Sequence, residues 1–237
     1  MPCSCFAFWR SSSDATGNVT AVIEDLLPAE VVSADVLGDD PDARLMPEEE
    51  PDVAKAVEKR VREYTIARSC ARRALGKLGL PEVAILRGNK RQPLWPDGIV
   101  GSITHTRGYY AAAVARAEEV LTVGIDAEQH AVLPDGVLGV VTVPEEREML
   151  AGLGTHNGVH WDRILFSAKE SVYKAWFPLT EKWLGFGDAR LTFQPDENTF
   201  SAKLLVEPPI VRGEPLTGFE GRFLVRDGYV VTAIAVL

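Results

Sequence analysis

Long apolar runs are missing from this sequence. Nowhere do 18 apolar residues follow one another, so no membrane-spanning helix is expected. The first residues also lack the charged and apolar regions of a secretion signal. Cysteine is scarce: Cys3, Cys5 and Cys70 have the spacing of neither a disulfide framework nor a zinc site. We therefore expect a cytoplasmic protein with reduced thiols and no membrane contact.

Three catalytic signatures are also missing. There is no Walker A motif and no Gly-x-Gly-x-x-Gly, which argues against P-loop kinases and Rossmann dehydrogenases. Without a Gly-x-Ser-x-Gly turn, Ser102 and His105 do not indicate a hydrolase. His156 and His160 have the spacing of a zinc-protease motif but lack its glutamate, so we expect a loop there and no metal site.

Positive charge is in deficit, with 25 Lys and Arg against 34 Asp and Glu, a net charge of −9. This balance argues against nucleic acid as a partner. The segment from Lys55 to Arg91 is the exception, because it holds 11 basic residues and three Glu. A basic island in an acidic protein indicates a dedicated anionic ligand, although part of it could be an ordinary solvated helix face.

The remaining composition is that of a globular protein of one large or two small domains: 237 residues, 46% hydrophobic. Apolar residues at steps of three and four predict one long helix over 52–78, after an exposed acidic loop at 35–52. Helices are also expected at 144–153 and 159–177. Strands are expected at 83–86, 99–105, 109–115, 121–128, 191–193, 203–206, 221–226 and 229–236. Each half then has a long helix plus strands, an α+β arrangement.

Two acidic groups indicate a cation site. Asp126 and Glu128 share one face of an expected strand, while Ile125 points to the other face. Glu170 and Lys174 are four residues apart on an aromatic-rich helix. Taken alone, the first pair could be an exposed polar edge of a strand, and the second could be an ordinary surface ion pair. Together, the three carboxylates suit Mg²⁺ shared with substrate phosphates, and a charge count with Lys169 and Lys174 favours a diphosphate ester as ligand.

The segment from Gly101 to Tyr109 offers hydroxyls and an imidazole between glycines. Ser102, Thr104 and His105 could bind phosphate there. A histidine that stands alone is also commonly a structural hydrogen-bonding group, and that alternative stays open.

Three ordered motifs resemble those of the 4′-phosphopantetheinyl transferases: Gly101-Ser-Ile-Thr-His105, Val123-Gly-Ile-Asp-Ala-Glu128, and the run from Phe166 to Trp176 that contains Lys169-Glu170 and Tyr173-Lys174. Residues 176–186 are most similar to the actinobacterial members that activate carrier proteins. The resemblance implies a monomer of two similar α+β halves related by a pseudo-twofold, here divided into residues 1–122, on the nucleotide side, and 123–237, with the metal and the catalytic helix.

The resemblance also implies the reaction and the site. The phosphopantetheine arm of coenzyme A is transferred to a serine of an apo acyl or peptidyl carrier protein, with release of 3′,5′-ADP. Asp126, Glu128 and Glu170 match the ligands of Mg²⁺, with Mn²⁺ as an alternative, and Glu170 and Lys174 are the expected catalytic pair. The residues matched to coenzyme A contacts are Arg60, Arg68, Arg87, Lys90, Ser102, Thr104, His105, Lys169, Tyr173, Lys174 and Trp183. One departure is Arg91, which stands where the family often has Gly.

Two other functions use the same residues. A Mg²⁺-dependent pyrophosphatase or nucleotidyl hydrolase would need the same carboxylates but would attack with water. A coenzyme A-binding module without turnover is a third possibility. The presence of Asp126, Glu128, Glu170 and Lys174 together argues against that module.

Overall fold

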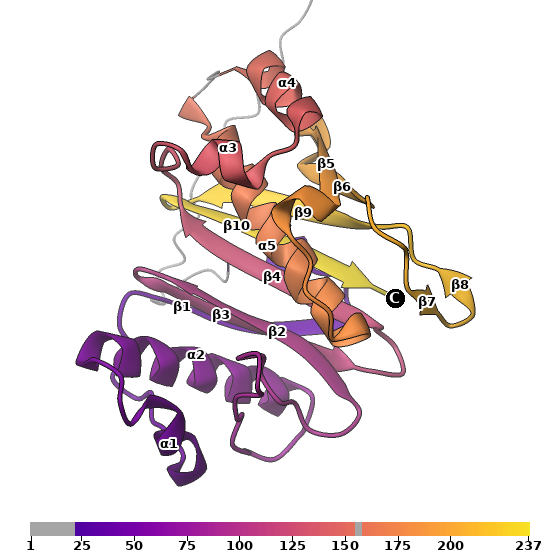
Figure 1. Ribbon diagram of the computed structural model, residues 1–237. Coiled ribbons are helices and arrows are strands. Elements are labelled where there is room, and N and C mark those ends of the chain that lie inside the picture. The colour runs from indigo at the N-terminus through magenta and orange to yellow at the C-terminus, as the bar shows by residue number, and fades with distance from the viewer. Residues whose placement is uncertain (1–21, 155–157) are drawn as a thin grey trace, which may run out of the picture.

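The computed structural model describes residues 22–154 and 158–237. Two antiparallel sheets pack against each other, and each carries one long helix on its outer side (Figure 1). The first sheet has the strand order β1-β3-β2 and the second the order β4-β10-β9-β6-β5; β7 and β8 form a separate hairpin. No helix in the described ranges is long and apolar enough to span a membrane.

The bounds of the helices are α1 (Glu50–Val53), α2 (Glu58–Lys77), α3 (Val137–Val141), α4 (Pro144–Leu153) and α5 (Trp161–Thr180). The bounds of the strands are β1 (Val31–Leu37), β2 (Ile99–Thr106), β3 (Tyr109–Arg116), β4 (Thr122–Gln129), β5 (Ala189–Gln194), β6 (Thr199–Leu204), β7 (Ile210–Val211), β8 (Glu214–Pro215), β9 (Gly218–Arg226) and β10 (Tyr229–Val236).

The two halves repeat one topology. In the first half, strand β1 is followed by α2 and the hairpin β2-β3, and β3 lies between β1 and β2. In the second half, β4 is followed by α5 and later by β9-β10, and β10 lies between β4 and β9. Helix α2 packs on the first sheet and α5 on the second. This repetition confirms the predicted α+β fold of two similar halves, which residue-level comparison of the halves did not reveal.

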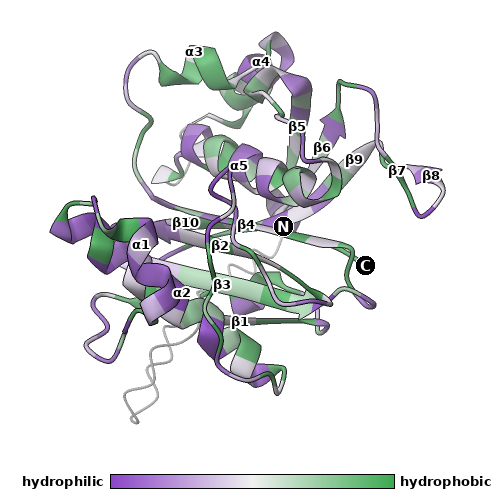
Figure 2. Ribbon diagram, turned by 60° about the horizontal axis from the view of Figure 1, so that its bottom comes forward, coloured by the Kyte–Doolittle hydropathy of each residue, from purple (hydrophilic) through white to green (hydrophobic). Residues whose placement is uncertain are grey.

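Strand β3 is buried on both faces, and its sequence is correspondingly rich in alanine. Tyr109, Ala111 and Ala113 face the second sheet, in a cluster that includes Ile125 of β4. The alternate residues, among them Val114, pack against α2. Small side chains on both faces let a sheet and a helix approach the strand closely. Figure 2 shows β3 in pale green, as a hydrophobic strand.

Helix α5 lies unusually close to β4, and a glycine makes this possible. A Cβ atom added to Gly124 would lie 2.1 Å from the carbonyl oxygen of Ser171. The apolar face of α5 packs on the second sheet through Leu165, Val172 and Trp176. Its polar residues are thereby held against the face of β4 that carries Asp126.

The predicted helix over 52–78 is wrong at its start. A continuous helix would separate residues 52 and 64 by about 18 Å along its axis. Instead, the Tyr64 hydroxyl donates to Asp52 Oδ2 at 2.8 Å, so the chain turns between α1 and α2. Asp52 Oδ2 also accepts from the backbone N–H of Arg87.

Three further expectations differ from the structure. Residues 83–86 run without a strand partner; the chain there forms only an isolated bridge between Arg87 and Pro93. Strand β1 was not predicted. The acidic segment 35–52 is not simply an exposed loop, since Asp40 and Glu49 are buried and pair with Arg73 and Arg72.

Candidate active site

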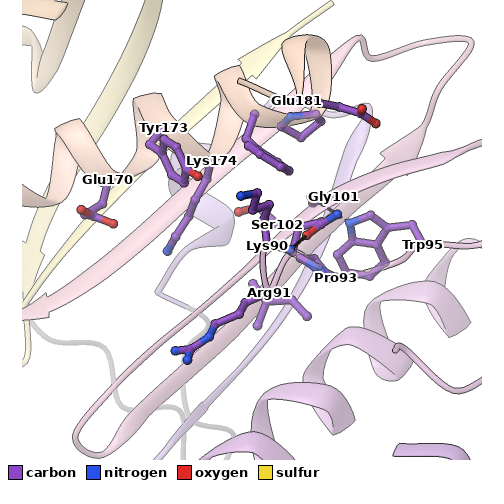
Figure 3. Close-up of a pocket in the computed structure, with 14 residues that line it drawn as sticks. Lys90, Arg91, Pro93, Trp95, Gly101, Ser102, Glu170, Tyr173, Lys174 and Glu181 are labelled. Atoms are coloured by element: carbon purple, nitrogen blue, oxygen red, sulfur yellow. Dashed lines mark hydrogen bonds between the residues drawn. The ribbon is translucent and has the colours of Figure 1, made fainter. Parts of the chain in front are cut away.

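A cleft of about 320 Å³ lies where the two halves meet (Figure 3). Helix α5 forms one wall, while β2 and the loop over residues 90–95 form the other. Its lining includes the predicted catalytic pair, Glu170 and Lys174, together with Ser102, Tyr173 and Lys90. The cleft therefore brings together residues 90–103 and residues 170–181, which are distant in the sequence.

Asp126 is the most heavily bonded acidic residue beside this cleft. The alternation of β4 turns Asp126 toward α5, as predicted, and Ile125 toward the inter-sheet core. Asp126 Oδ1 accepts from Lys174 Nζ at 2.8 Å and from the Thr104 hydroxyl at 3.2 Å. Asp126 Oδ2 accepts from the Ser167 hydroxyl at 2.9 Å. These bonds fix the carboxylate and hold Lys174 beside it.

Side chains of β2 hydrogen-bond the outer edge of β4. Ser102 Oγ accepts from the backbone N–H of Ile125 at 3.1 Å, and Thr104 Oγ1 accepts from that of Ala127 at 3.0 Å. Thr104 is buried and also donates to Asp126, so it supports the site from beneath in this structure, and its contact with phosphate stays a prediction. Ser102 also lines the cleft, so its phosphate contact stays a prediction.

Glu170 lies between two hollows. It lines the cleft and also a smaller hollow of about 220 Å³, which Tyr173, Trp183 and Phe186 border. Burial, and next the negative charge of Asp126, raise the pKa of Glu170 above its ordinary value. A carboxylate with a raised pKa is a better proton acceptor near neutral pH.

The rings of Tyr173 and Trp183 lie 5.1 Å apart, and Trp183 is 76% exposed. They make an aromatic wall at the smaller hollow beside Glu170. The family resemblance matches both residues to contacts with coenzyme A, which stay predictions.

The three predicted metal ligands do not form a closed cluster. Glu128 pairs with Arg163 at 3.1 Å, and Asp126 pairs with Lys174. The ranges 22–154 and 158–237 contain no group of three His, Cys, Asp or Glu side chains placed to hold a metal ion.

The chemistry of these carboxylates nevertheless fits a hard cation. Burial, and next the charge of Asp126, raise the pKa of Glu128, as they do that of Glu170. A divalent ion would relieve this repulsion, and carboxylate oxygens are what Mg²⁺ prefers. The metal site stays a prediction.

His105 and Arg60 lie together at the far end of β2. Arg60 Nη1 is within hydrogen-bond distance of His105 Nε2, and Arg60 also pairs with Glu63 at 3.5 Å. Burial, and next the charge of Arg60, lower the pKa of His105 to about 4, so the imidazole is neutral at pH 7. The contact of both residues with a phosphate of coenzyme A stays a prediction.

The structure places three other predicted cations elsewhere. Arg68 is buried, with Nε donating to the carbonyl of Ile85 at 2.7 Å and the guanidinium over the ring of Tyr64. Arg72, expected on the same basic face, forms a buried ion pair with Glu49 at 2.6 Å. In the structure without coenzyme A, both side chains stabilise the first half of the molecule. The contact of Arg68 with coenzyme A stays a prediction.

Lys169 is the third of these cations. Its Nζ pairs with Glu146 at 2.8 Å and donates to the carbonyls of Phe186 and Ala189. Its side chain is 3% exposed and joins α5 to α4. Lys169 lines the smaller hollow with Glu170 and not the cleft that Lys174 lines, so its contact with diphosphate stays a prediction.

Arg87 and Lys90 remain on the exposed loop beside the cleft. Arg87 Nη2 donates to the carbonyl of Asp52 at 3.2 Å, while Lys90 lines the cleft itself. Their coenzyme A contacts stay predictions. His156 lies outside the described residues; the backbone N–H of His160 donates to His130 Nε2.

Sequence reasoning missed two residues that support this site. Arg163 pairs with Glu128 and donates to the carbonyls of Ala131 and Val132. Ser167 donates to Asp126. Both lie on the α5 face that carries Glu170, at steps of three and four residues, so helical periodicity offered a signal for them.

Comparison with known proteins identifies the family of this chain and agrees with its fold. Residues 48–115 match the model of the 4′-phosphopantetheinyl transferase N-terminal domain, and residues 122–227 match that of the 4′-phosphopantetheinyl transferase superfamily. The chain belongs to this family and is a 4′-phosphopantetheinyl transferase. The predicted division after residue 122 lies near the gap between the two matches but stays a prediction.

Three relatives cover nearly the whole chain. The chain is 53% identical to the transferase Svp of Streptomyces mobaraensis, over 91% of this chain and 89% of Svp. It is 49% identical to Npt of Nocardia iowensis, over 90% and 99%. It is 46% identical to PptT of Mycobacterium tuberculosis, over 91% and 98%. The predicted similarity to actinobacterial members is confirmed.

Proposed function

We propose that this enzyme transfers the 4′-phosphopantetheine arm of coenzyme A to a serine of apo acyl or peptidyl carrier proteins, releases 3′,5′-ADP, and depends on Mg²⁺. The carriers belong to fatty acid, polyketide or nonribosomal peptide synthases. The observation that carries the proposal is the shared cleft, in which Glu170 and Lys174 lie beside Asp126. We also expect the enzyme to act as a cytoplasmic monomer.

The serine hydroxyl of the carrier is a poor nucleophile until it loses its proton. Glu170 accepts that proton, because its raised pKa and its place in the cleft suit a general base. The serine oxygen then bonds to the phosphorus that carries pantetheine, and the bond from this phosphorus to the bridging oxygen breaks. The 3′,5′-ADP leaves with that oxygen.

Lys174 supplies positive charge where the phosphoryl group passes. Its ammonium is held by Asp126 and by the carbonyl of Ile125 at 2.9 Å, so it is positioned before the substrate arrives. A fixed cation costs little reorganisation when charge develops. Arg60 and His105 lie at the end of β2 where they would hold another phosphate.

Asp126, Glu128 and Glu170 would hold the metal. Bound Mg²⁺ would neutralise charge on the diphosphate, which makes 3′,5′-ADP a better leaving group. The support for this set is that burial, and next the charge of Asp126, raise the pKa of Glu128 and of Glu170. Mn²⁺ has similar ligand preferences and is an alternative.

The experiment is mass spectrometry of an apo carrier protein after incubation with the enzyme, coenzyme A and Mg²⁺. We expect the carrier to gain one phosphopantetheine on a serine. Glu170→Gln should abolish turnover while coenzyme A binding stays within about threefold, since the base is lost and the fold is kept.

The matched control is Glu148→Gln, an exposed position on α4, which should keep full turnover. Coenzyme A consumption with an unmodified carrier would instead establish a hydrolase. Unchanged turnover in Glu170→Gln would refute the assigned base.

A further inference from the structure

The loop that borders the cleft ends in a strained arginine. The backbone N–H of Arg91 donates to the carbonyl of Gly88 at 2.8 Å, and that of Gly88 donates to the carbonyl of Gln92 at 2.8 Å. This pattern is a tight turn followed by one bulged residue, a position that needs a left-handed backbone and favours glycine. Arg91 occupies it with φ of 69°.

Stability does not account for an arginine at this position. A side chain with a left-handed backbone is disfavoured, and glycine would adopt the same conformation without strain. Arg91 is exposed, and its guanidinium has no ion pair or hydrogen bond with any residue in 22–154 or 158–237. The strain is therefore not offset by a contact within the described protein.

The direction of the side chain links it to the active site. Arg91 lines the same cleft as Lys174 and Glu170, and Figure 3 shows its guanidinium pointing to the same side of the cleft as the Lys174 amine. A strained residue that aims an unpaired cation into a cleft is the arrangement expected of a ligand contact.

The charge of the substrate gives this cation a task. Coenzyme A carries a diphosphate and a further phosphate monoester, together about −4 at pH 7. Of the cations predicted to meet it, Arg68 and Lys169 are buried and bonded elsewhere. The cleft itself also contains the carboxylates of Glu170 and Glu181. Additional positive charge is needed there, and Arg91 supplies it.

We propose that Arg91 is a substrate-binding residue that contacts the phosphates of coenzyme A through its guanidinium, at the expense of backbone strain in the turn over residues 88–92. This inference rests on the proposed function, because it takes coenzyme A as the ligand of the cleft. A cleft of about 320 Å³ suits part of a small molecule better than a protein helix, so we assign Arg91 to coenzyme A and not to the carrier.

Arg91→Gly tests the proposal and has a matched control. Arg212 also has a left-handed backbone, with φ of 51°, but lies in the β7-β8 turn and not in the cleft. Glycine should relieve strain at either position, and each variant should melt about 2–4 °C higher than the parent. Only Arg91→Gly should weaken coenzyme A binding, by roughly threefold to tenfold in Kd measured by calorimetry without carrier.

Two further measurements separate charge from structure. Arg91→Lys keeps the charge, so its Kd should stay closer to that of the parent than to that of Arg91→Gly. The ratio of Kd between Arg91→Gly and the parent should shrink at 0.5 M salt, since an exposed contact is screened.

An unchanged Kd for coenzyme A in Arg91→Gly would overturn the proposal, and so would a raised KM for the carrier alone. The same loss of affinity in Arg212→Gly would also overturn it. A parent enzyme that binds coenzyme A without modifying any carrier would contradict the proposed function but leave this test intact.

Discussion

Lys169 offers a sharp test because the sequence and the structure assign it different roles. The family resemblance matches it to a lysine that contacts diphosphate, whereas the structure buries it against Glu146 at 2.8 Å. Replacing Lys169 by Met removes the ammonium and leaves the Glu146 carboxylate, which is 0% exposed, without its cation. The carboxylate keeps only the backbone N–H groups of Val143 and Leu191 as donors. The carbonyls of Phe186 and Ala189 also lose a donor.

The expected cost is large. Breaking a buried ion pair by removing one partner typically costs 3–5 kcal/mol. Burial already lowers the pKa of Lys169, so its charge carries a desolvation cost, and we take the lower end, about 3 kcal/mol. In a protein of this size that corresponds to a melting temperature lower by roughly 6–12 °C.

Urea unfolding measures this effect. Lys169→Met should lower the free energy of unfolding by about 3 kcal/mol at an unchanged m-value, and adding Glu146→Gln should recover at least 1 kcal/mol, because the orphaned charge is removed. Lys203→Met, at an exposed position on β6, is the control and should stay within about 0.5 kcal/mol. The reasoning fails if Lys169→Met keeps its stability but weakens coenzyme A binding tenfold or more, which would support the diphosphate role instead.

Two other predictions concern the packing and the pH dependence of the site. Gly124→Ala should lower the free energy of unfolding by about 3 kcal/mol or more, because the added Cβ would lie 2.1 Å from the backbone of α5. Gly139→Ala is the control and should not destabilise the protein, because the space around Gly139 is open. Thermal melts of the two variants test this, and equal melting temperatures would contradict the close packing of α5 on β4. The pKa of His105 is about 4 when folded and about 6.5 when unfolded, so the stability from its neutral form is complete above pH 6.5 and is lost as the pH falls toward 4. When the pH falls from 7 to 5, the free energy of unfolding measured in urea should therefore decrease by about 1–2 kcal/mol less in His105→Gln than in the parent. The same pH dependence of this free energy in both proteins would show that the imidazole is not buried in this way.

Local patterns in the sequence predicted much of the fold. Alternation placed Asp126 and Ile125 on opposite faces of β4, and helical periodicity placed Glu170 beside Lys174, because both depend on neighbours within a few residues. The same reasoning extended α2 too far, since the bond between Tyr64 and Asp52 that turns the chain is not a local feature.

Partners distant in sequence could not be predicted in this way. Glu49 is 23 residues from Arg72, and the periodicity of α2 does not show that its basic residues turn inward. Likewise, nothing near Lys169 indicates that Glu146 is buried beside it. The motifs predicted which residue types the site needs, while the tertiary structure decides which cations face the cleft.

The central claim is that Asp126, Glu128 and Glu170 act together on one metal beside the diphosphate of coenzyme A. Anomalous diffraction from crystals grown with Mn²⁺ and coenzyme A tests it most directly. We predict one peak at metal–oxygen distance from all three carboxylates, with Lys174 and Arg163 drawn away from Asp126 and Glu128. A peak at another position would contradict the account. So would the absence of a peak while Asp126 stays paired with Lys174 and Glu128 with Arg163.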